Sequence, residues 1–122
     1  KLGKGMVFTN LVDFDSLYGH RNNPVGYAEA LERFDTQLPE VIESLDDGDW
    51  LMISADHGCD PTNMETTDHS REFVPWIFYQ KGAEQGIDLG TRSSFCDIGQ
   101  TIVDGFNLPA LQNGVSVLKE LS

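Results

Sequence analysis

Apolar and polar positions follow two different patterns in the first half of the chain, and together they predict a strand, a helix and a second strand. Residues 6–12 (MVFTNLV) form a short, mostly apolar run of the kind found in strands covered on both faces. From Tyr27 to Leu45 apolar residues recur every three or four positions, as in an amphipathic helix that Pro39 should kink or restart. Residues 50–55 form a second apolar run, so the order is that of a βαβ unit.

The second half of the chain predicts a polar loop, one more strand and one more helix. The loop covers residues 56–72, and an apolar run at 74–79 predicts the third strand. Ser94 and Asp97 have the spacing of a capping box, which predicts that a helix begins there. The apolar face of this helix would carry Ile98, Ile102 and Phe106. No repeat or interdomain linker interrupts these patterns, so we expect residues 1–122 to form a single α/β domain.

The charge of the chain narrows the classes of partner. Its 122 residues include 20 acidic and 8 basic side chains, a formal net charge of −12. No cluster of Lys or Arg offers a surface for phosphate backbones, so nucleic acid and anionic membrane surfaces are excluded as expected partners, and cations are favoured. The polar face of the predicted helix holds much of the negative charge and should face solvent: Glu29, Glu32, Asp35, Glu40 and Glu43.

Cysteine content and hydropathy indicate an intracellular location. Cys59 and Cys96 are too few and too far apart for a disulfide framework, and no CxxC pair suggests a zinc or redox site. No apolar run approaches the length of a membrane span, and the first residues lack the apolar stretch of a signal peptide. We therefore expect free thiols in a reducing cytoplasm, with Cys59 serving as a packing residue.

The three histidines of the chain all fall in loops that a βαβ unit would bring to one edge of the sheet. His20 follows the first predicted strand, and His57 and His69 follow the second. Because the carboxyl ends of parallel strands emerge at the same edge, these loops should meet, together with Asp15 and Asp56. Taken singly, each residue is more simply a surface, core or capping residue. Taken together, the five indicate a metal site.

The chemistry of these five side chains limits the metal. Imidazole nitrogens and carboxylate oxygens without a thiolate suit Mn²⁺, Fe²⁺, Zn²⁺ or Mg²⁺ better than a structural zinc site. Five candidate ligands exceed one tetrahedral site and suit most of a two-metal cluster, of the kind that stabilises a transferring phosphoryl group. This reasoning leaves the identity of the metal open.

Three segments of the chain also resemble a known family. They are residues 12–21 (VDFDSLYGHR), 54–62 (SADHGCDPT) and 67–72 (TDHSRE). These motifs are similar to those of phosphopentomutases, which belong to the alkaline phosphatase superfamily, and the likeness extends through residues 113–121. The run 56–72 is closer to phosphopentomutase than to cofactor-independent phosphoglycerate mutase.

The resemblance implies a fold, an activity and a ligand set. The fold is an α/β portion of the three-layer alkaline phosphatase-like core that contains the βαβ unit and lacks the cap domain. The activity is that of an isomerase, an intramolecular phosphotransferase of nucleoside and pentose phosphate metabolism. It interconverts ribose 1-phosphate and ribose 5-phosphate, and the deoxyribose equivalents, through a phosphorylated threonine. Two Mn²⁺ ions are implied, one bound by Asp56 and His57 and the other by Asp15, His20 and His69.

Three further residues near the ligands have less specific expectations. Asp13 does not match a ligand position of the family, and we expect it to orient Arg21 or a ligand histidine. Arg21 and Arg71 stand beside ligand histidines in the sequence. Each arginine is expected either to contact a phosphate group or to pair with nearby carboxylates.

The chain also departs from the family pattern. That pattern begins with an amino-terminal aspartate ligand and the threonine that accepts the phosphoryl group, and it carries an inserted cap domain. None of these matches any of the 122 residues, so we expect the carboxyl-terminal part of a longer enzyme, with no catalytic residue of its own and no activity alone. Two alternatives remain open. One is another metalloenzyme of the superfamily, such as a phosphatase, phosphodiesterase or phosphoglycerate mutase, and the other is a non-catalytic metal-binding domain.

Overall fold

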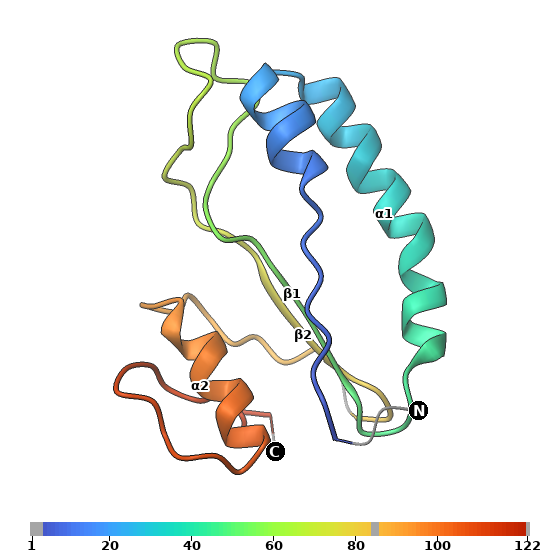
Figure 1. Cartoon of the computed structure of the whole chain (residues 1–122), viewed down its shortest axis with the longest axis vertical. Coiled ribbons are helices and arrows are strands. Elements are labelled where there is room, and N and C mark those ends of the chain that lie inside the picture. The colour runs from blue at the N-terminus through green and yellow to red at the C-terminus, as the bar shows by residue number, and fades with distance from the viewer. Residues whose placement is uncertain (1–3, 84–85, 122) are drawn as a thin grey trace. The chain divides into compact units, whose positions relative to one another are not determined.

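The computed structural model describes residues 4–83 and 86–121, which fall into two compact units, 1–83 and 84–122. The described elements of the first unit are the π-helical turn η1 (Phe14–Tyr18), the 3₁₀ turn η2 (Gly19–Arg21), α1 (Pro24–Ser44), β1 (Trp50–Ser54) and β2 (Trp76–Gln80), and the second unit contributes α2 (Cys96–Gly105) (Figure 1). The chain is therefore a small mixed α/β structure. None of the described helices combines the length and the apolar character needed to cross a membrane.

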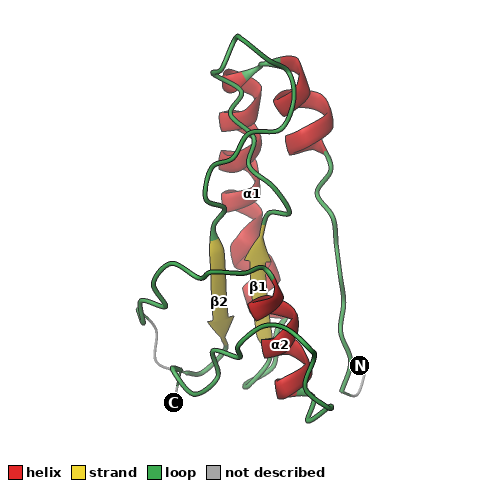
Figure 2. Cartoon of the chain, turned by 90° about the vertical axis from the view of Figure 1, so that its left-hand side faces the viewer, coloured by secondary structure: helices red, strands yellow, loops and turns green. Residues whose placement is uncertain are grey.

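The described strands form one antiparallel pair. β1 pairs with β2 in a register that runs from Trp50 opposite Gln80 to Ser54 opposite Trp76 (Figure 2). The rings of Trp50 and Phe78 pack at a tilt with their centroids 5.1 Å apart. β2 starts two residues later than the predicted strand at 74–79, directly after Pro75. Proline has no N–H to donate to a strand ladder, which accounts for this start.

The predicted strand at residues 6–12 is wrong, and with it the predicted parallel βαβ unit. None of these residues belongs to a strand or a bridge in the part of the chain that the structure describes. Val7 and Phe8 are 76% and 81% exposed. A strand exists only when a neighbour takes up its backbone hydrogen bonds, and within the described residues β1 pairs with β2 instead. The composition of the run is typical of a strand, but none of the described residues pairs with it.

Helix α1 begins three residues earlier than predicted and is anchored at both ends. The side chain of Asn23 accepts a hydrogen bond from the Gly26 N–H at 3.0 Å, and Pro24 occupies the first helical position, where its missing N–H costs nothing. At the other end Lys81 Nζ donates to the carbonyl groups of Ile42, Glu43 and Leu45 at 3.1, 3.2 and 2.6 Å. A lysine so placed satisfies carbonyls that have no partner within the helix.

The predicted restart of this helix at Pro39 does not occur, because α1 is continuous from Pro24 to Ser44. Proline removes one backbone donor and leaves the carbonyl of Asp35 without its helical partner. Pro39 lies on the exposed side of the helix, where water can hydrate that carbonyl. The cost is therefore one hydrogen bond, which the remaining turns tolerate.

The second unit is organised around a buried carboxylate on α2. Asp97 is only 3% exposed, and its two oxygens accept hydrogen bonds from the Val115 N–H at 2.9 Å and from Arg92 Nε at 3.0 Å. One turn later the fully buried Thr101 hydroxyl donates to the Asp97 carbonyl at 2.7 Å and accepts from the Val117 N–H at 3.1 Å. Two polar side chains of α2 thus fix the extended segment that follows the helix.

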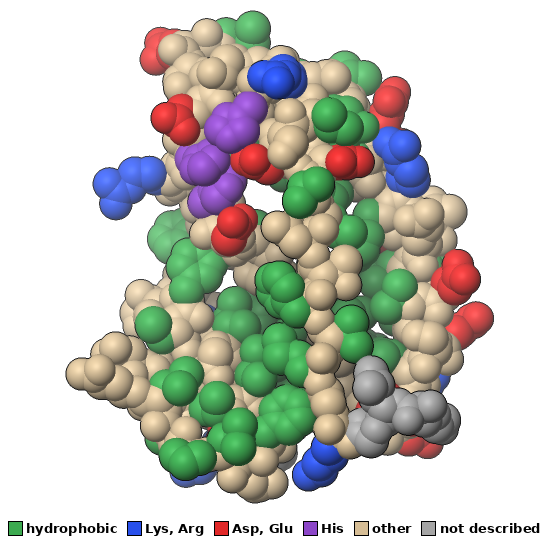
Figure 3. All heavy atoms as spheres, in the orientation of Figure 1, with side chains coloured by type: hydrophobic (Ala, Val, Ile, Leu, Met, Phe, Trp, Pro, Cys, Tyr) green, Lys and Arg blue, Asp and Glu red, His purple; other side chains and the backbone are tan. Residues whose placement is uncertain are grey.

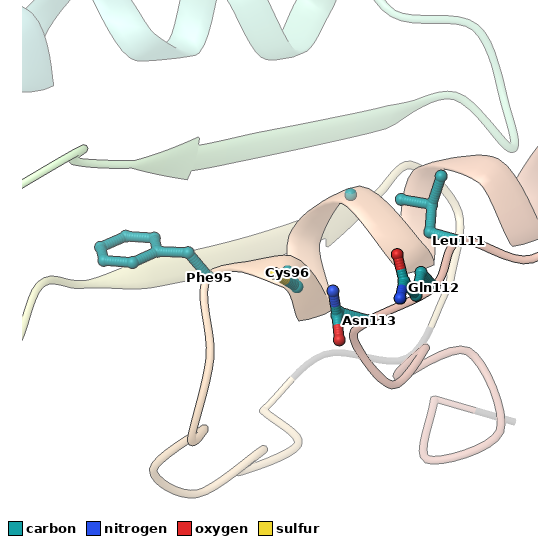
Figure 4. Close-up of a pocket in the computed structure, with 6 residues that line it drawn as sticks. Phe95, Cys96, Leu111, Gln112 and Asn113 are labelled. Atoms are coloured by element: carbon teal, nitrogen blue, oxygen red, sulfur yellow. The ribbon is translucent and has the colours of Figure 1, made fainter.

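The predicted capping box at Ser94 and Asp97 is wrong, because the buried Asp97 carboxylate makes other contacts. The Ser94 hydroxyl accepts from the Cys96 N–H at 3.1 Å, but the Asp97 carboxylate is turned inward, to Arg92 and Val115. The helix itself forms as predicted and ends at Gly105. A shallow pocket on this unit has six lining residues, none of them acidic, basic or histidine: Phe95, Cys96, Gly99, Leu111, Gln112 and Asn113 (Figure 4).

We predict that Asp97→Ala lowers the free energy of unfolding by about 2–3 kcal/mol, because it leaves the Arg92 guanidinium and a backbone N–H without their buried partner. Urea unfolding at pH 7 measures this loss. Asp104→Ala, which removes an exposed carboxylate from the same helix, is the matched control and should change the free energy little. Equal losses in the two variants would show that the buried contacts of Asp97 contribute nothing.

The same contacts make the stabilisation dependent on pH. Hydrogen bonding from the Val115 N–H, and then from Arg92, lowers the pKa of Asp97 below its ordinary value of 3.8. A lowered pKa in the folded state means that the stabilisation is complete above the unfolded pKa and is lost as the pH falls through the folded value. The difference in stability between the parent chain and Asp97→Ala should therefore shrink below about pH 4. A difference that stays constant down to pH 2 would contradict this assignment.

Candidate metal centre

The three histidines lie together in one patch on the surface of the first unit, with acidic side chains beside them (Figure 3). His20 belongs to η2, His57 follows β1, and His69 precedes β2. The loop between β1 and β2 extends to the end of the unit where η1 and η2 lie (Figure 1). The predicted meeting of these loops is confirmed, although a parallel sheet edge is not what brings them together.

Close backbone contacts at two glycines hold the loops in place. Gly58 and Ser70 form an isolated antiparallel bridge, with the Ser70 N–H donating to the Gly58 carbonyl at 3.1 Å. A Cβ atom at Gly58 would lie 2.6 Å from the Ser70 carbonyl oxygen, so a side chain has no room there. The buried Gly19 packs against a side-chain atom, Cys59 Sγ, and so joins η2 to the start of the loop. Cys59 is thus a packing residue, as predicted.

The bridge also places two of the histidines against each other. His57 and His69 directly precede the bridged residues, and their rings stack with centroids 3.6 Å apart. The ring of His20 also packs against that of His69, at a tilt and with centroids 4.9 Å apart. Three imidazoles thus form a contiguous group that opens toward Asp15.

The Nε2 atoms of the three imidazoles converge on one carboxylate oxygen. Asp15 Oδ1 lies 3.2 Å from His20 Nε2, 3.4 Å from His69 Nε2 and 3.6 Å from His57 Nε2. The Nε2 atoms of His20 and His69 are 3.1 Å apart. The oxygen is buried, yet none of the described residues provides it with a hydrogen-bond donor.

Hydrogen bonds on the far side of two rings explain why His20 and His57 donate no proton to this oxygen. His20 Nδ1 donates to the Thr67 carbonyl, and His57 Nδ1 donates to the Gly58 carbonyl at 3.0 Å. Because a carbonyl oxygen only accepts, both Nδ1 atoms carry the ring proton, and in the neutral rings both Nε2 atoms present lone pairs. Lone pairs that face a carboxylate oxygen repel it unless a cation lies between them.

The donor set fits a divalent ion. Two ligands bound to one ion at about 2.1 Å each lie about 3.0–3.4 Å apart, which matches the spacing of the Asp15, His20 and His69 donors. These three residues offer one ligand atom each within 4.8 Å of one another. Cys59 is not a member of this group. Burial, followed by the negative charge of Asp15, raises the pKa of the Cys59 thiol.

The second predicted ligand pair is more open. Asp56 Oδ1 lies 3.6 Å from His57 Nε2, but the Asp56 side chain is 89% exposed. His57 Nε2 is equally far from Asp15 Oδ1, so His57 stands between the two carboxylates. This geometry brings all five predicted ligand residues into one region and completes only one three-residue group.

Asp13, Arg21 and Arg71 are exposed. Neither arginine forms an ion pair with any residue that the structure describes, and the Asp13 carboxylate makes no capping hydrogen bond to η1. Neither guanidinium group is therefore held in an ion pair by the described residues. Sequence reasoning missed two residues that contact the loop: Gly58, which forms the bridge to Ser70, and Asn22, whose amide donates to the Asn63 and Thr66 carbonyls. The glycine directly after His57 is a signal that could have been used, whereas nothing in the pattern of the sequence distinguishes Asn22.

Comparisons with known proteins show which family this chain belongs to. The family model of the metalloenzyme superfamily matches residues 2–110. The chain is 54% identical over 121 residues to a phosphopentomutase of Kosmotoga olearia, an alignment that covers 99% of this chain and 31% of the relative. It is 56% identical to the phosphopentomutase of Thermotoga petrophila over 111 residues, 91% of this chain and 28% of the relative, and 56% identical to that of Desulfitobacterium hafniense over 117 residues, 96% and 30%.

The chain therefore spans about 30% of the length of the curated relatives it matches. The resemblance noted in its motifs is confirmed over almost the whole of the chain. Because the family model covers most of the residues, including Asp15 and all three histidines, the chain belongs to the metalloenzyme superfamily and is homologous to phosphopentomutases.

Proposed function

We propose that residues 1–122 are the carboxyl-terminal part of the metal-binding core of a manganese-dependent phosphopentomutase of the cytoplasm. The intact enzyme would interconvert (deoxy)ribose 1-phosphate and (deoxy)ribose 5-phosphate. The observation that carries this proposal is the convergence of imidazole nitrogens on a buried carboxylate oxygen that has no donor among the described residues. Identity of more than 50% to phosphopentomutases supports the reaction.

In this proposal the five ligand residues hold two ions. Asp15, His20 and His69 would bind one, and Asp56 and His57 would bind the other. The close spacing within the first group and the position of His57 between two carboxylates support the assignment. Bound divalent ions would supply positive charge that stabilises the negative charge of a transferring phosphoryl group.

The protein groups of this chain would have two tasks besides binding metal. The Nδ1 hydrogen bonds of His20 and His57 keep the two rings in the tautomer that presents Nε2. The exposed arginines next to the ligand histidines would orient the phosphate group of a sugar phosphate through charge-assisted hydrogen bonds. The threonine that accepts the phosphoryl group would lie outside these residues.

The metal centre is tested by calorimetric titration of the purified chain with Mn²⁺. Asp15→Ala or His69→Ala should weaken binding on the order of 100-fold, because each removes a ligand and leaves the opposing donors unmatched. Asp35→Ala removes an exposed carboxylate from α1 and controls for the change in net charge. Equal affinities of Asp15→Ala and Asp35→Ala for Mn²⁺ would contradict the metal centre and with it the proposed function.

In this proposal the accepting threonine lies outside residues 1–122. We therefore predict that the 122-residue chain alone does not convert ribose 1-phosphate in the presence of Mn²⁺. A coupled assay for ribose 5-phosphate measures this. Turnover would contradict the proposal that the accepting threonine lies elsewhere. An intact enzyme that is inert toward pentose phosphates but hydrolyses other phosphate esters would instead identify a phosphatase of the same superfamily.

Loss of either exposed arginine should weaken phosphate binding. We expect Arg21→Met or Arg71→Met to lower the affinity of the Mn²⁺-loaded protein for ribose 5-phosphate on the order of tenfold. The affinity for Mn²⁺ itself should not change, because neither side chain contacts a ligand residue in the part that the structure describes. Arg33→Met, which removes an exposed arginine from α1, is the matched control. Arginine variants that bind ribose 5-phosphate as tightly as this control would exclude the role.

A further inference from the structure

The loop that supplies His69 is long, and most of its internal hydrogen bonds are local. The Asp60 carboxylate accepts from the N–H and the hydroxyl of Thr62 at 2.9 and 2.6 Å. The Asn63 side chain accepts from the Glu65 N–H, and the Thr66 hydroxyl accepts from the Asp68 N–H, both at 3.0 Å. These bonds shape the loop tip, but they do not fix its position relative to η2, where His20 lies.

The side chains of Asn22 and His20 provide that connection. Asn22 Nδ2 donates to the Asn63 carbonyl at 3.1 Å and to the Thr66 carbonyl at 3.0 Å. An amide group carries two protons, and here each of them has a carbonyl acceptor in the loop tip. The next carbonyl along the chain, that of Thr67, accepts the hydrogen bond from His20 Nδ1. The orientation of the His20 ring therefore depends on where Asn22 holds residues 63–66.

The backbone of Asn22 aims the side chain at the loop. Asn22 ends η2 in the left-handed conformation, with φ 46° and ψ 47°, and its N–H donates to the Gly19 carbonyl at 3.0 Å. Asparagine adopts this conformation at low cost, whereas most residues with a Cβ do not. Glycine would fit the backbone but has no donor, and aspartate would place an acceptor where a donor is needed.

We propose that Asn22 is a positioning residue of the metal centre. Its amide clamps the tip of the 58–70 loop onto η2, so that the Thr67 carbonyl orients His20 and His69 comes to lie opposite Asp15. The proposal rests on the proposed function, since it assumes that these residues bind a divalent ion. The clamp involves no ligand atom of the centre.

Asn22→Gly tests the clamp, because it keeps the left-handed backbone and removes both donors. Its affinity for Mn²⁺ in calorimetric titration should fall on the order of tenfold, as found for groups that orient metal ligands. Asn107→Gly is the matched control, since Asn107 is the other non-glycine residue with positive φ, 55°, among those that the structure describes. It lies in the second unit, and its affinity for Mn²⁺ should equal that of the parent chain.

Amide hydrogen exchange without metal separates positioning from a general loss of structure. In Asn22→Gly the amides of residues 63–69 should exchange faster, while those of β1 and the middle of α1 keep their protection. Faster exchange throughout the first unit would overturn the proposal, because Asn22 would then support the fold. If Asn22→Gly does not fold, Asn22→Asp replaces it, with the same expected loss of affinity.

The metal titrations distinguish this proposal from the proposed function. Unchanged affinity in Asn22→Gly together with weakened binding in His69→Ala would overturn the clamp and leave the metal centre standing. Unchanged affinity in both Asp15→Ala and His69→Ala would overturn the metal centre and, with it, the clamp. Weakened binding in Asn22→Gly but not in Asn107→Gly, with the change in exchange confined to residues 63–69, supports both.

Discussion

The single bridge between Gly58 and Ser70 determines where the imidazoles of the candidate centre lie. It closes a loop of polar residues at its base and leaves His57 and His69 stacked beside each other. Because Gly58 lacks a side chain, the two backbones approach closely enough for the Ser70 N–H to reach its acceptor. The positions of the remaining groups follow from this contact, since Asp15 and His20 face the pair that it holds together.

The same geometry brings together groups that repel one another electrostatically. Backbone carbonyls hold the ring protons of His20 and His57 on the outer side, so the Nε2 atoms of these two rings face the Asp15 oxygen as acceptors. Bringing acceptors together destabilises a fold, and the fold tolerates the arrangement because the backbone contact at Gly58 and the packing of Gly19 on Cys59 fix the loops without the imidazole side chains. Such stored repulsion is typical of sites built to receive a cation.

Much of the candidate site could be predicted from the sequence, whereas the topology that assembles it could not. Imidazole and carboxylate side chains gathered in two loops favour metal binding, so their chemistry was enough to predict the candidate ligands Asp15, His20, Asp56, His57 and His69. Strand pairing depends on partners that are remote in sequence. The run at 6–12 has the composition of a strand, yet β1 pairs with β2, and the bridge at Gly58 brings the loops together in place of a parallel sheet edge. The role of Asn22 was not predicted and that of Asp97 was predicted wrongly, because both depend on which distant carbonyl or N–H each one meets.

The exposed apolar run at 6–12 has a thermodynamic consequence for metal binding by Asp15. The run leads through Val12, whose carbonyl accepts from the Ser16 N–H, directly into the turn that carries Asp15. Ordering of the run by a pairing strand would also restrict the start of η1 and reduce the entropy that Asp15 loses when it binds an ion. By linkage, an ion bound at Asp15 would favour that pairing by the same amount of free energy. Pairing of the run with a strand and binding of an ion at Asp15 would then be thermodynamically coupled.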